Sequence, residues 1–228
     1  MSSIRLEHVQ LTLTSRAGPV AILQDVDLTI EDGETVGIVG PSGSGKSSLL
    51  MVAAGLEPAT SGQVVVAGRD ISRANENDRA IVRSQAMGIV FQSFHLMPTM
   101  TARENVALPL ELRGASDGLE RADRALNEVG LGHRREHFPA ELSGGEQQRV
   151  AIARAIVGQP RILFADEPTG NLDQRTGQEI IELLLRIGAE HGTTLVLVTH
   201  DAALARRCQR QITLGDGRIV KDERIASA

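Results

Sequence analysis

Two kinds of hydrophobic pattern alternate along the chain. Apolar and polar residues alternate over 4–13 and 21–30, which predicts two antiparallel strands joined by a turn. Thr35–Val39 is instead a run of apolar and β-branched residues between two glycines, the pattern of a buried strand. Similar short runs predict strands over 63–66, 88–91, 161–166 and 193–199, and residues 211–214 and 218–221 predict a closing hairpin.

Helical spacing of apolar residues fills most of the intervals between these strands. The predicted helices cover 46–54, 78–84, 102–111, 118–129, 144–156, 176–189 and 202–207. Alternation of strand and helix predicts an α/β fold whose sheet is mostly parallel, with helices on both faces. Residues 93–158 have helical patterns and few β-branched runs. We therefore expect an α/β core from 1–92 and 159–228, including the N-terminal antiparallel β subdomain, and a helical subdomain over 93–158.

The composition narrows the class of protein. A chain of 228 residues can build one substantial core with an appended subdomain. Its net charge of −5 argues against a general nucleic-acid binder, which usually has a basic surface. The chain has neither an apolar N-terminal signal region nor an apolar run long enough to span a membrane, so we expect a cytoplasmic protein, soluble or peripheral. The single cysteine, Cys208, is expected to be a buried bystander.

The first chemical motif follows the predicted strand at 35–39. Gly40-x-x-x-x-Gly45-Lys46-Ser47 matches the P-loop pattern and leads into a predicted helix. We expect the loop backbone and the helix N-terminus to hold nucleotide phosphates, Lys46 to neutralise the β- and γ-phosphates, and the Ser47 hydroxyl to bind Mg²⁺. The strand–loop–helix context disfavours the alternative, a glycine-rich turn with a surface lysine. The predicted contact residues are Gly40, Pro41, Ser42, Gly43, Ser44, Gly45, Lys46, Ser47 and Ser48.

Two carboxylates end another buried strand. The apolar run Ile162–Ala165 is followed directly by Asp166 and Glu167. Ligands bind at the carboxyl edge of open α/β sheets, so both side chains are expected near the P-loop. Asp166 would hold Mg²⁺, directly or through water, and Glu167 would polarise the attacking water as a general base. The alternative is an ordinary acidic turn, which the P-loop upstream disfavours.

Two further polar residues follow predicted strands and should reach the same edge. His200 ends the strand at 193–199 and could bond to the γ-phosphate and sense its loss. Gln92 follows the strand at 88–91 and could reach Mg²⁺ or the attacking water. The other histidines, at 8, 95, 133, 137 and 191, are given the ordinary structural interpretation.

A second glycine turn begins the motif Leu142–Gln148, which leads into the predicted helix at 144–156. This motif gives the strongest indication of family. Together with the motifs above, its sequence Leu-Ser-Gly-Gly-Glu-Gln-Gln makes nearly the whole chain resemble the ATP-binding subunit of ABC transporters. The resemblance identifies 40–47 with the Walker A loop, Gln92 with the Q-loop, 142–148 with the signature, 161–167 with Walker B, 171–173 with the D-loop, and His200 with the switch histidine.

This resemblance implies a mechanism. In the family, two subunits pair head to tail around two Mg-ATP molecules, and the signature of one faces the P-loop of the other. Ser143, Gly144 and Gly145 would then contact the nucleotide bound by the partner copy, and Asp173 would lie across the seam. The dimer would drive integral membrane permease subunits from the cytoplasmic face, without binding nucleic acid. Similarity to the lipoprotein-release and macrolide-exporter group implies export or a lipid- or lipoprotein-related task.

One departure from the family pattern concerns the nucleotide base. Many members stack adenine on an aromatic residue in the N-terminal strands, but this chain has no Tyr and no Trp, and its first Phe is Phe91. The corresponding region is near Thr12 and Leu13. We therefore expect Leu13 and Val20 to hold the base by apolar contact.

The segment Ser93–Met100 directly follows Gln92 and contains several apolar residues, two of them methionines. It is either local core or a groove for a cytoplasmic helix of the permease, coupled to the nucleotide through Gln92. Two other functions remain as alternatives. A soluble ABC ATPase acting on nucleic acid or ribosomes usually has long coiled coils or two ATPase units. An inert nucleotide-binding regulator would not need Glu167, His200 and Gln92.

Overall fold

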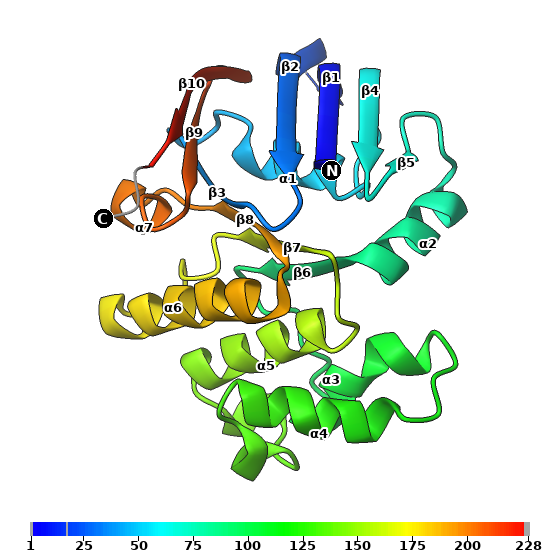
Figure 1. Ribbon diagram of the computed structural model, residues 1–228, viewed down its shortest axis with the longest axis vertical. Helices are drawn as coiled ribbons and strands as arrows, with labels where there is room; N and C mark the ends of the chain where they lie inside the picture. The colour runs from blue at the N-terminus through cyan, green and yellow to red at the C-terminus, as the bar shows by residue number, and fades with distance from the viewer. Residues whose placement is uncertain (1, 17, 226–228) are drawn as a thin grey trace.

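Three layers follow one another along the long axis of the molecule (Figure 1). The computed structural model describes residues 2–16 and 18–225. It has an antiparallel sheet at one end, a mostly parallel sheet in the middle and a group of helices at the other end. This arrangement confirms the α/β fold class predicted from the sequence.

The antiparallel sheet has the strand order β2-β1-β4-β5. Its inward-facing residues alternate with exposed ones, as the hydrophobic pattern predicts for a half-buried sheet. The two-residue strand β5 was not predicted, because so short a strand leaves no periodic signal in the sequence. The strands are β1 (Ser2–Ser15), β2 (Gly18–Glu31), β4 (Ser61–Val66) and β5 (Arg69–Asp70).

The central sheet has the order β10-β9-β3-β8-β7-β6, in which only β10 runs antiparallel to its neighbour. Strands β7 and β8 are apolar and buried along almost their whole length. The mostly parallel sheet and its closing hairpin therefore agree with the prediction. The strands are β3 (Thr35–Val39), β6 (Met87–Phe91), β7 (Ile162–Asp166), β8 (Thr194–Val198), β9 (Arg210–Gly215) and β10 (Arg218–Arg224).

The helices follow the predicted ranges closely, with differences at their ends. The helix expected over 202–207 ends at Ala205 because the chain turns there and buries Cys208. No helix of the described part of the chain is long and apolar enough to cross a membrane. The α-helices are α1 (Lys46–Ala53), α2 (Glu76–Ala86), α3 (Ala102–Glu111), α4 (Gly118–Glu128), α5 (Gly144–Ile156), α6 (Gln174–His191) and α7 (Ala202–Ala205), with 3₁₀ turns η1 (Gly132–Arg134) and η2 (Pro139–Glu141).

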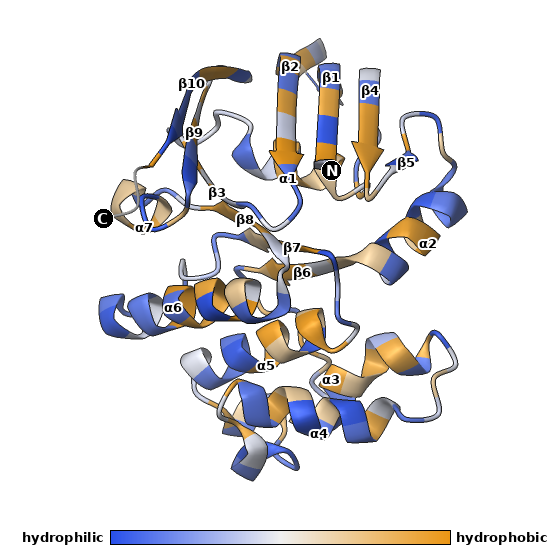
Figure 2. Ribbon diagram, in the orientation of Figure 1, coloured by the Kyte–Doolittle hydropathy of each residue, from blue (hydrophilic) through white to orange (hydrophobic). Residues whose placement is uncertain are grey.

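Two hydrophobic clusters cover the two faces of the central sheet. Ile162 and Phe164 of β7 belong to the cluster shared with the antiparallel sheet and α1. Leu163 and Ala165 belong to the cluster shared with α3, α4, α5 and α6. Figure 2 shows the apolar residues of these strands and helices gathered toward the middle of the molecule. The second cluster is continuous from the sheet into the helices, so the proposed division at 92 and 158 is not marked by separate cores.

The single cysteine lies in the second cluster. Cys208 is buried, and burial raises the pKa of its thiol to about 12. The thiol therefore stays protonated at neutral pH, in agreement with the prediction of a bystander.

One buried polar residue fixes the loop between β6 and α3. The side chain of Asn105 is fully buried, and its Oδ1 accepts a hydrogen bond from Met97 N (2.7 Å). Its Nδ2 donates to the carbonyl oxygens of Met97, Met100 and Thr101 at 3.0–3.1 Å. A side chain that satisfies four backbone groups holds this loop in one conformation.

We predict that Asn105→Ala lowers the free energy of unfolding by about 2 kcal/mol, because the backbone groups of the loop lose their partner. Urea denaturation measures this change. The exposed Glu111 of the same helix provides the control, since Glu111→Ala should change stability by less than about 0.5 kcal/mol. Equal stability of the two variants would contradict the role given to Asn105.

Candidate nucleotide-binding site

Four neighbouring strands of the central sheet end at one edge and bring the predicted residues together. The register pairs Phe91 with Asp166 and Asp166 with Val198, and Ile38 of β3 also pairs with Val198. Each of these strand ends is followed, within two residues, by a part of the predicted site: Gln92 after β6, Glu167 after β7, His200 after β8 and the P-loop after β3. Parallel pairing of these strands therefore brings the predicted site residues to one edge of the sheet.

The P-loop connects β3 to α1 in a tightly packed conformation. Gly40, Gly43 and Gly45 all have positive φ values, and a Cβ at Gly40 would lie 2.2 Å from the carbonyl oxygen of Leu214. Lys46 begins α1, and its Nζ donates to the carbonyl oxygens of Gly40 and Pro41 at 3.0 Å. Glycine is required here because no other residue fits this backbone.

The other serines and the proline of the loop differ in burial. Pro41, Ser42 and Gly43 are exposed, whereas Ser48 is half-buried in the first turn of α1. The hydroxyl of Ser44 is buried and has no hydrogen-bond partner among the described residues. An unpaired buried hydroxyl in a phosphate-binding loop is available to a ligand.

Ser47 and Asp166 form an oxygen-rich pair between the P-loop and β7. The Ser47 hydroxyl donates to Asp166 Oδ1 at 2.9 Å. Burial raises the pKa of Asp166, with a smaller contribution from the neighbouring Glu167 carboxylate, while the Ser47 hydrogen bond and Lys46 oppose this rise. A hydroxyl and a half-buried carboxylate are ligands of the kind that Mg²⁺ prefers, so these residues fit the predicted ion.

Glu167 and His200 are in direct contact. The sequence placed them at the same edge of the sheet but did not predict this contact. His200 Nδ1 lies 2.7 Å from Glu167 Oε2, and the Glu167 side chain is largely buried while that of His200 is exposed. The backbone of Glu167 has φ 47°, and its amide donates to Val198 O at 2.9 Å. A non-glycine residue in the left-handed region is strained, and such strain is common at functional sites.

Gln92 lies at the same edge but bonds to the D-loop. Its Nε2 donates to Asn171 Oδ1 (3.3 Å), and Asn171 Nδ2 donates to the Gln92 carbonyl (3.0 Å). A Cβ at Gly170 would lie 2.6 Å from Gln92 Nε2, so this glycine makes room for the glutamine. Asn171 was not singled out as a partner of Gln92, because nothing in the spacing of the two residues predicts the contact.

The signature turn opens onto a different cavity. Ser143 is the N-cap of α5, and Gly144 and Gly145 form its first turn against the D-loop. A Cβ at Gly145 would lie 2.7 Å from Thr176 Cγ2. The cavity, of about 390 Å³, is lined by Ser143, Gly144, Gly145, Glu146, Arg149, Asn171, Leu172, Asp173, Thr176 and Glu179, and none of these belongs to the P-loop.

Asp173 has a local role in the same cavity. Its carboxylate caps α6 by accepting hydrogen bonds from Thr176 N (3.1 Å) and Thr176 Oγ1 (2.6 Å). These bonds lower the pKa of Asp173, the side-chain bond being the larger cause. Sequence reasoning missed a second capping contact, between Ser143 and Glu146, and the ion pair of Glu146 with Arg134. The Ser-x-x-Glu pattern of a capping box could have revealed the first of these.

The predicted base-contacting residues are cross-strand neighbours. Leu13 of β1 pairs with Val20 of β2, and 41% and 45% of these side chains are exposed. The strand continues from Val20 to Ile22, whose carbonyl oxygen would lie 2.9 Å from a Cβ at Gly45. An exposed apolar pair therefore lies on the strand that borders the phosphate loop.

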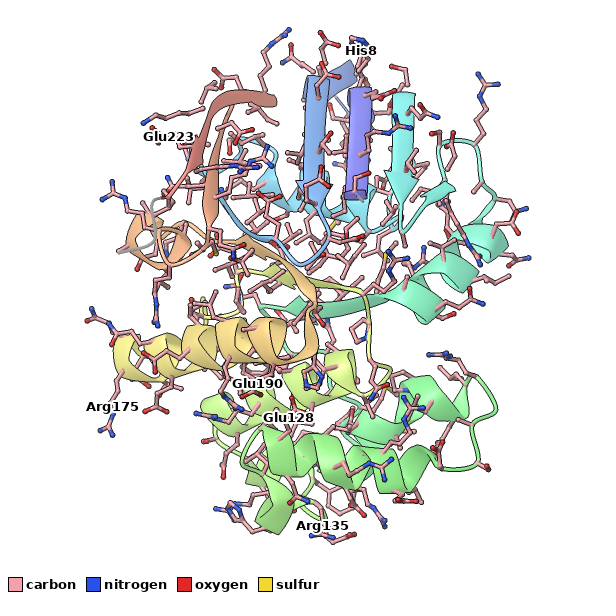
Figure 3. The ribbon with its side chains drawn as sticks, viewed as in Figure 1. His8, Glu128, Arg135, Arg175, Glu190 and Glu223 are labelled. Atoms are coloured by element: carbon pink, nitrogen blue, oxygen red, sulfur yellow. The ribbon has the colours of Figure 1, made fainter. Side chains whose placement is uncertain are left out.

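Two of the remaining histidines have carboxylate partners far from the P-loop. His8 Nδ1 is 2.9 Å from Asp25 Oδ1, and the ligand atoms of His8, Asp25 and Asp27 lie within 4.8 Å of one another. Figure 3 shows His8 at the outer end of the antiparallel sheet. His191 Nε2 lies 2.7 Å from Glu128 Oε1. Exposed charged groups of this kind are common, and we assign no ion to them.

A glycine-rich loop between a strand and a helix, with a serine in the first helical turn bonded to a carboxylate at the end of β7, defines a P-loop nucleoside triphosphatase. Residues 23–170 match the ABC transporter family. The chain is 48% identical to the uncharacterized ABC transporter ATP-binding protein YbbA of Escherichia coli (strain K12), covering 96% of this chain and 97% of that protein. The chain therefore belongs to the ABC transporter family and is an ATP-hydrolysing cassette of it.

Other relatives support the same assignment. The lipoprotein-releasing system ATP-binding protein LolD of Geobacter metallireducens is 48% identical over 97% of this chain and 100% of that protein. The dimeric, post-hydrolysis structure of the ATP-binding cassette MJ0796 bound to ADP and Pi has a TM-score of 0.91 and 39% identity, covering 99% of this chain and 100% of that one. These similarities confirm the predicted resemblance to the family and to its lipoprotein-release group.

We predict weak selection for the base. An apolar Leu13–Val20 pair lacks the aromatic stack that would contribute about 1 kcal/mol. GTP should therefore compete with ATP in an equilibrium binding assay, and Leu13→Tyr should strengthen ATP binding by about fivefold. A preference of the natural chain for ATP of about a hundredfold or more, equivalent to about 2.7 kcal/mol, would contradict the prediction.

Proposed function

We propose that two copies of this chain close head to tail around two Mg-ATP molecules and that hydrolysis reopens them, driving a separate membrane permease. The observation that carries this proposal is the separation of two anion-binding helix ends. One follows the P-loop, and the other follows the signature turn and lines a cavity without P-loop residues. A second copy is needed to bring the two ends to one nucleotide.

The residues of the sheet edge take the following roles. The P-loop backbone, Ser42, Ser44, Ser48 and the Lys46 ammonium bind the phosphates. Ser47 and Asp166 would hold Mg²⁺, which would neutralise phosphate charge, and Gln92 would join this set after leaving Asn171. Glu167 accepts a proton from the attacking water, and His200, within hydrogen-bond distance of Glu167, contacts the γ-phosphate.

The seam between the copies uses the other helix end. Ser143, Gly144 and Gly145 of one copy contact the γ-phosphate held by the other copy, with the dipole of α5 directed at the same anion. Asp173 lies at the start of α6, next to Arg175, which Figure 3 shows projecting away from the molecule. The dimeric MJ0796 structures support this arrangement. Residues 93–158 would move as the unit that carries the signature.

The segment Ser93–Met100 is proposed as the permease contact. Met97 is 44% exposed, whereas Leu96 packs against the core. Arg154 of α5 donates to the carbonyl oxygens of Phe94 (2.7 Å) and His95 (2.6 Å), which ties the segment to the signature helix. Beside it, an apolar cavity of about 460 Å³ lies between α2, β6, α3 and α5. A permease helix bound here would act on the nucleotide through Gln92 and α5.

Similarity to LolD favours a lipoprotein- or lipid-related export task at the cytoplasmic face of the membrane, with the permease as the anchor. The alternative, an ABC ATPase acting on nucleic acid or ribosomes, is disfavoured by the net charge of −5.

The clamp is tested with Glu167→Gln. The amide cannot act as a base, so ATP hydrolysis should fall at least about a hundredfold while ATP binding is retained. The variant should then accumulate as a dimer in Mg-ATP, measured by light scattering after size exclusion. Glu111→Gln, an exposed change on α3, should remain like the natural chain. A Glu167→Gln chain that stays monomeric in saturating Mg-ATP would exclude the clamp.

The permease contact is tested with Met97→Asp in the copurified transporter. Loss of an apolar anchor should reduce permease-stimulated ATPase activity by about tenfold while basal activity stays unchanged. Reversing the charge of Glu104 would also break the capping box that it forms with Thr101. Glu104→Gln keeps this cap and tests the charge alone. Unchanged stimulation in both variants would contradict the proposed surface.

A further inference from the structure

The signature serine is already bonded to an anion of its own chain. Glu146 Oε2 accepts hydrogen bonds from Ser143 N (2.9 Å) and Ser143 Oγ (2.8 Å). These contacts, above all the one from the backbone amide, lower the pKa of Glu146, so it is charged at neutral pH. The hydroxyl that would reach the partner copy's phosphate therefore donates to a carboxylate inside the same helix turn.

Arg134 holds the other oxygen of this carboxylate. Its Nε donates to Glu146 Oε1 at 2.9 Å, and its Nη1 donates to His137 Nε2 at 3.0 Å. Both side chains of the ion pair are partly buried, with 37% and 23% exposed. The following residue, Arg135, marks this place in Figure 3, at the end of the helical layer farthest from the antiparallel sheet. Arg134 thus reaches the signature turn from the η1 segment.

The charges that line the cavity indicate what the Arg134–Glu146 pair does. Three carboxylates, those of Glu146, Asp173 and Glu179, line it together with the single guanidinium of Arg149. Arg149 is itself paired with Glu179, at 3.1 Å. A surface with more carboxylates than cations repels phosphate unless the surplus is offset from outside the lining.

We propose that Glu146 is an internal counter-anion of the signature turn and that Arg134 is the positioning residue that offsets its charge. The pair then sets how strongly the turn binds the terminal phosphate held by the partner copy. The inference rests on the proposed head-to-tail clamp and adds a control of its closing. When the phosphate arrives, the Ser143 hydroxyl changes its acceptor from Glu146 to phosphate, and Arg134 continues to hold Glu146.

The experiment measures the ATP concentration at half-maximal dimerisation, with every variant made on the Glu167→Gln chain. Glu146→Gln keeps an acceptor for the capping box but removes the charge, so this concentration should fall by about fivefold. Arg134→Gln leaves the charge of Glu146 uncompensated, so the ATP concentration at half-maximal dimerisation should rise by about fivefold. Arg134→Lys should restore the parent value. ATP binding by dilute monomers does not involve the signature turn and should be unchanged in all variants.

The double variant separates the mechanism from direct contact. If Arg134 acts by offsetting the charge of Glu146, removing both charges in the double variant should return the ATP dependence to the parent value. A half-maximal concentration well above the parent's would mean that Arg134 contacts the nucleotide itself and would overturn the inference. Glu190→Gln breaks an exposed pair with Arg186 on α6 and serves as the matched control.

Two outcomes distinguish this inference from the clamp. If the parent Glu167→Gln chain forms no dimer in Mg-ATP, the clamp fails and the inference with it. If the parent dimerises but Glu146→Gln leaves the ATP dependence unchanged or shifts it upward, the clamp stands and the inference is overturned. Circular dichroism of each variant establishes that it is folded. If Arg134→Gln is not folded, Glu146→Gln, which keeps the capping box, carries the test by itself.

Discussion

Burial of β7 and β8 on both faces is the constraint on which the functional edge depends. Ile162 and Phe164 enter one core, and Leu163 and Ala165 enter the other. A slip of one residue would exchange these sets and place them against the wrong partners, so the register is strongly fixed. The same register determines where Asp166 and Glu167 leave the sheet. Hydrophobic packing therefore positions the charged residues that no apolar contact could hold directly.

The chain uses the same device, the N-terminus of a helix, in two different electrostatic settings. Helix α1 has no acidic residue in its first turn and begins with Lys46, so its end is strongly positive. Helix α5 begins with a serine cap and carries Glu146 in its first turn. The first end is suited to binding a triphosphate. The second carries its own anion, so its attraction for phosphate depends on how that anion is compensated.

Buried polar side chains connect these sites to the surface between β6 and α3. Asn105 fixes the loop from within α3, and Arg154 fixes it from α5, although burial lowers the pKa of this guanidinium. The loop begins directly after Gln92, which bonds to Asn171 of the D-loop. Hydrogen bonds therefore join this loop to the signature helix and to the sheet edge, in addition to the apolar packing of Leu96.

Much of the fold could be predicted because its signals are local. Thr35–Val39, Ala102–Glu111 and Gly144–Ile156 have the predicted bounds, since continuous apolar runs and helical spacing are properties of short segments. Helix ends were less certain. Helix α6 begins at Gln174, two residues before the predicted start at 176. This start depends on the cap by Asp173, which is a contact between side chain and backbone.

Local patterns were enough to predict most strands, the α-helices and the residue types expected to bind phosphate, because glycine, lysine and carboxylate patterns have chemistry of their own. Which of these residues meet depends on the tertiary structure. The contact of Glu167 with His200, the bond of Gln92 to Asn171 and the pairing of Arg134 with Glu146 join positions 12 to 79 residues apart. Such contacts depend on strand register and helix packing, which no local pattern encodes.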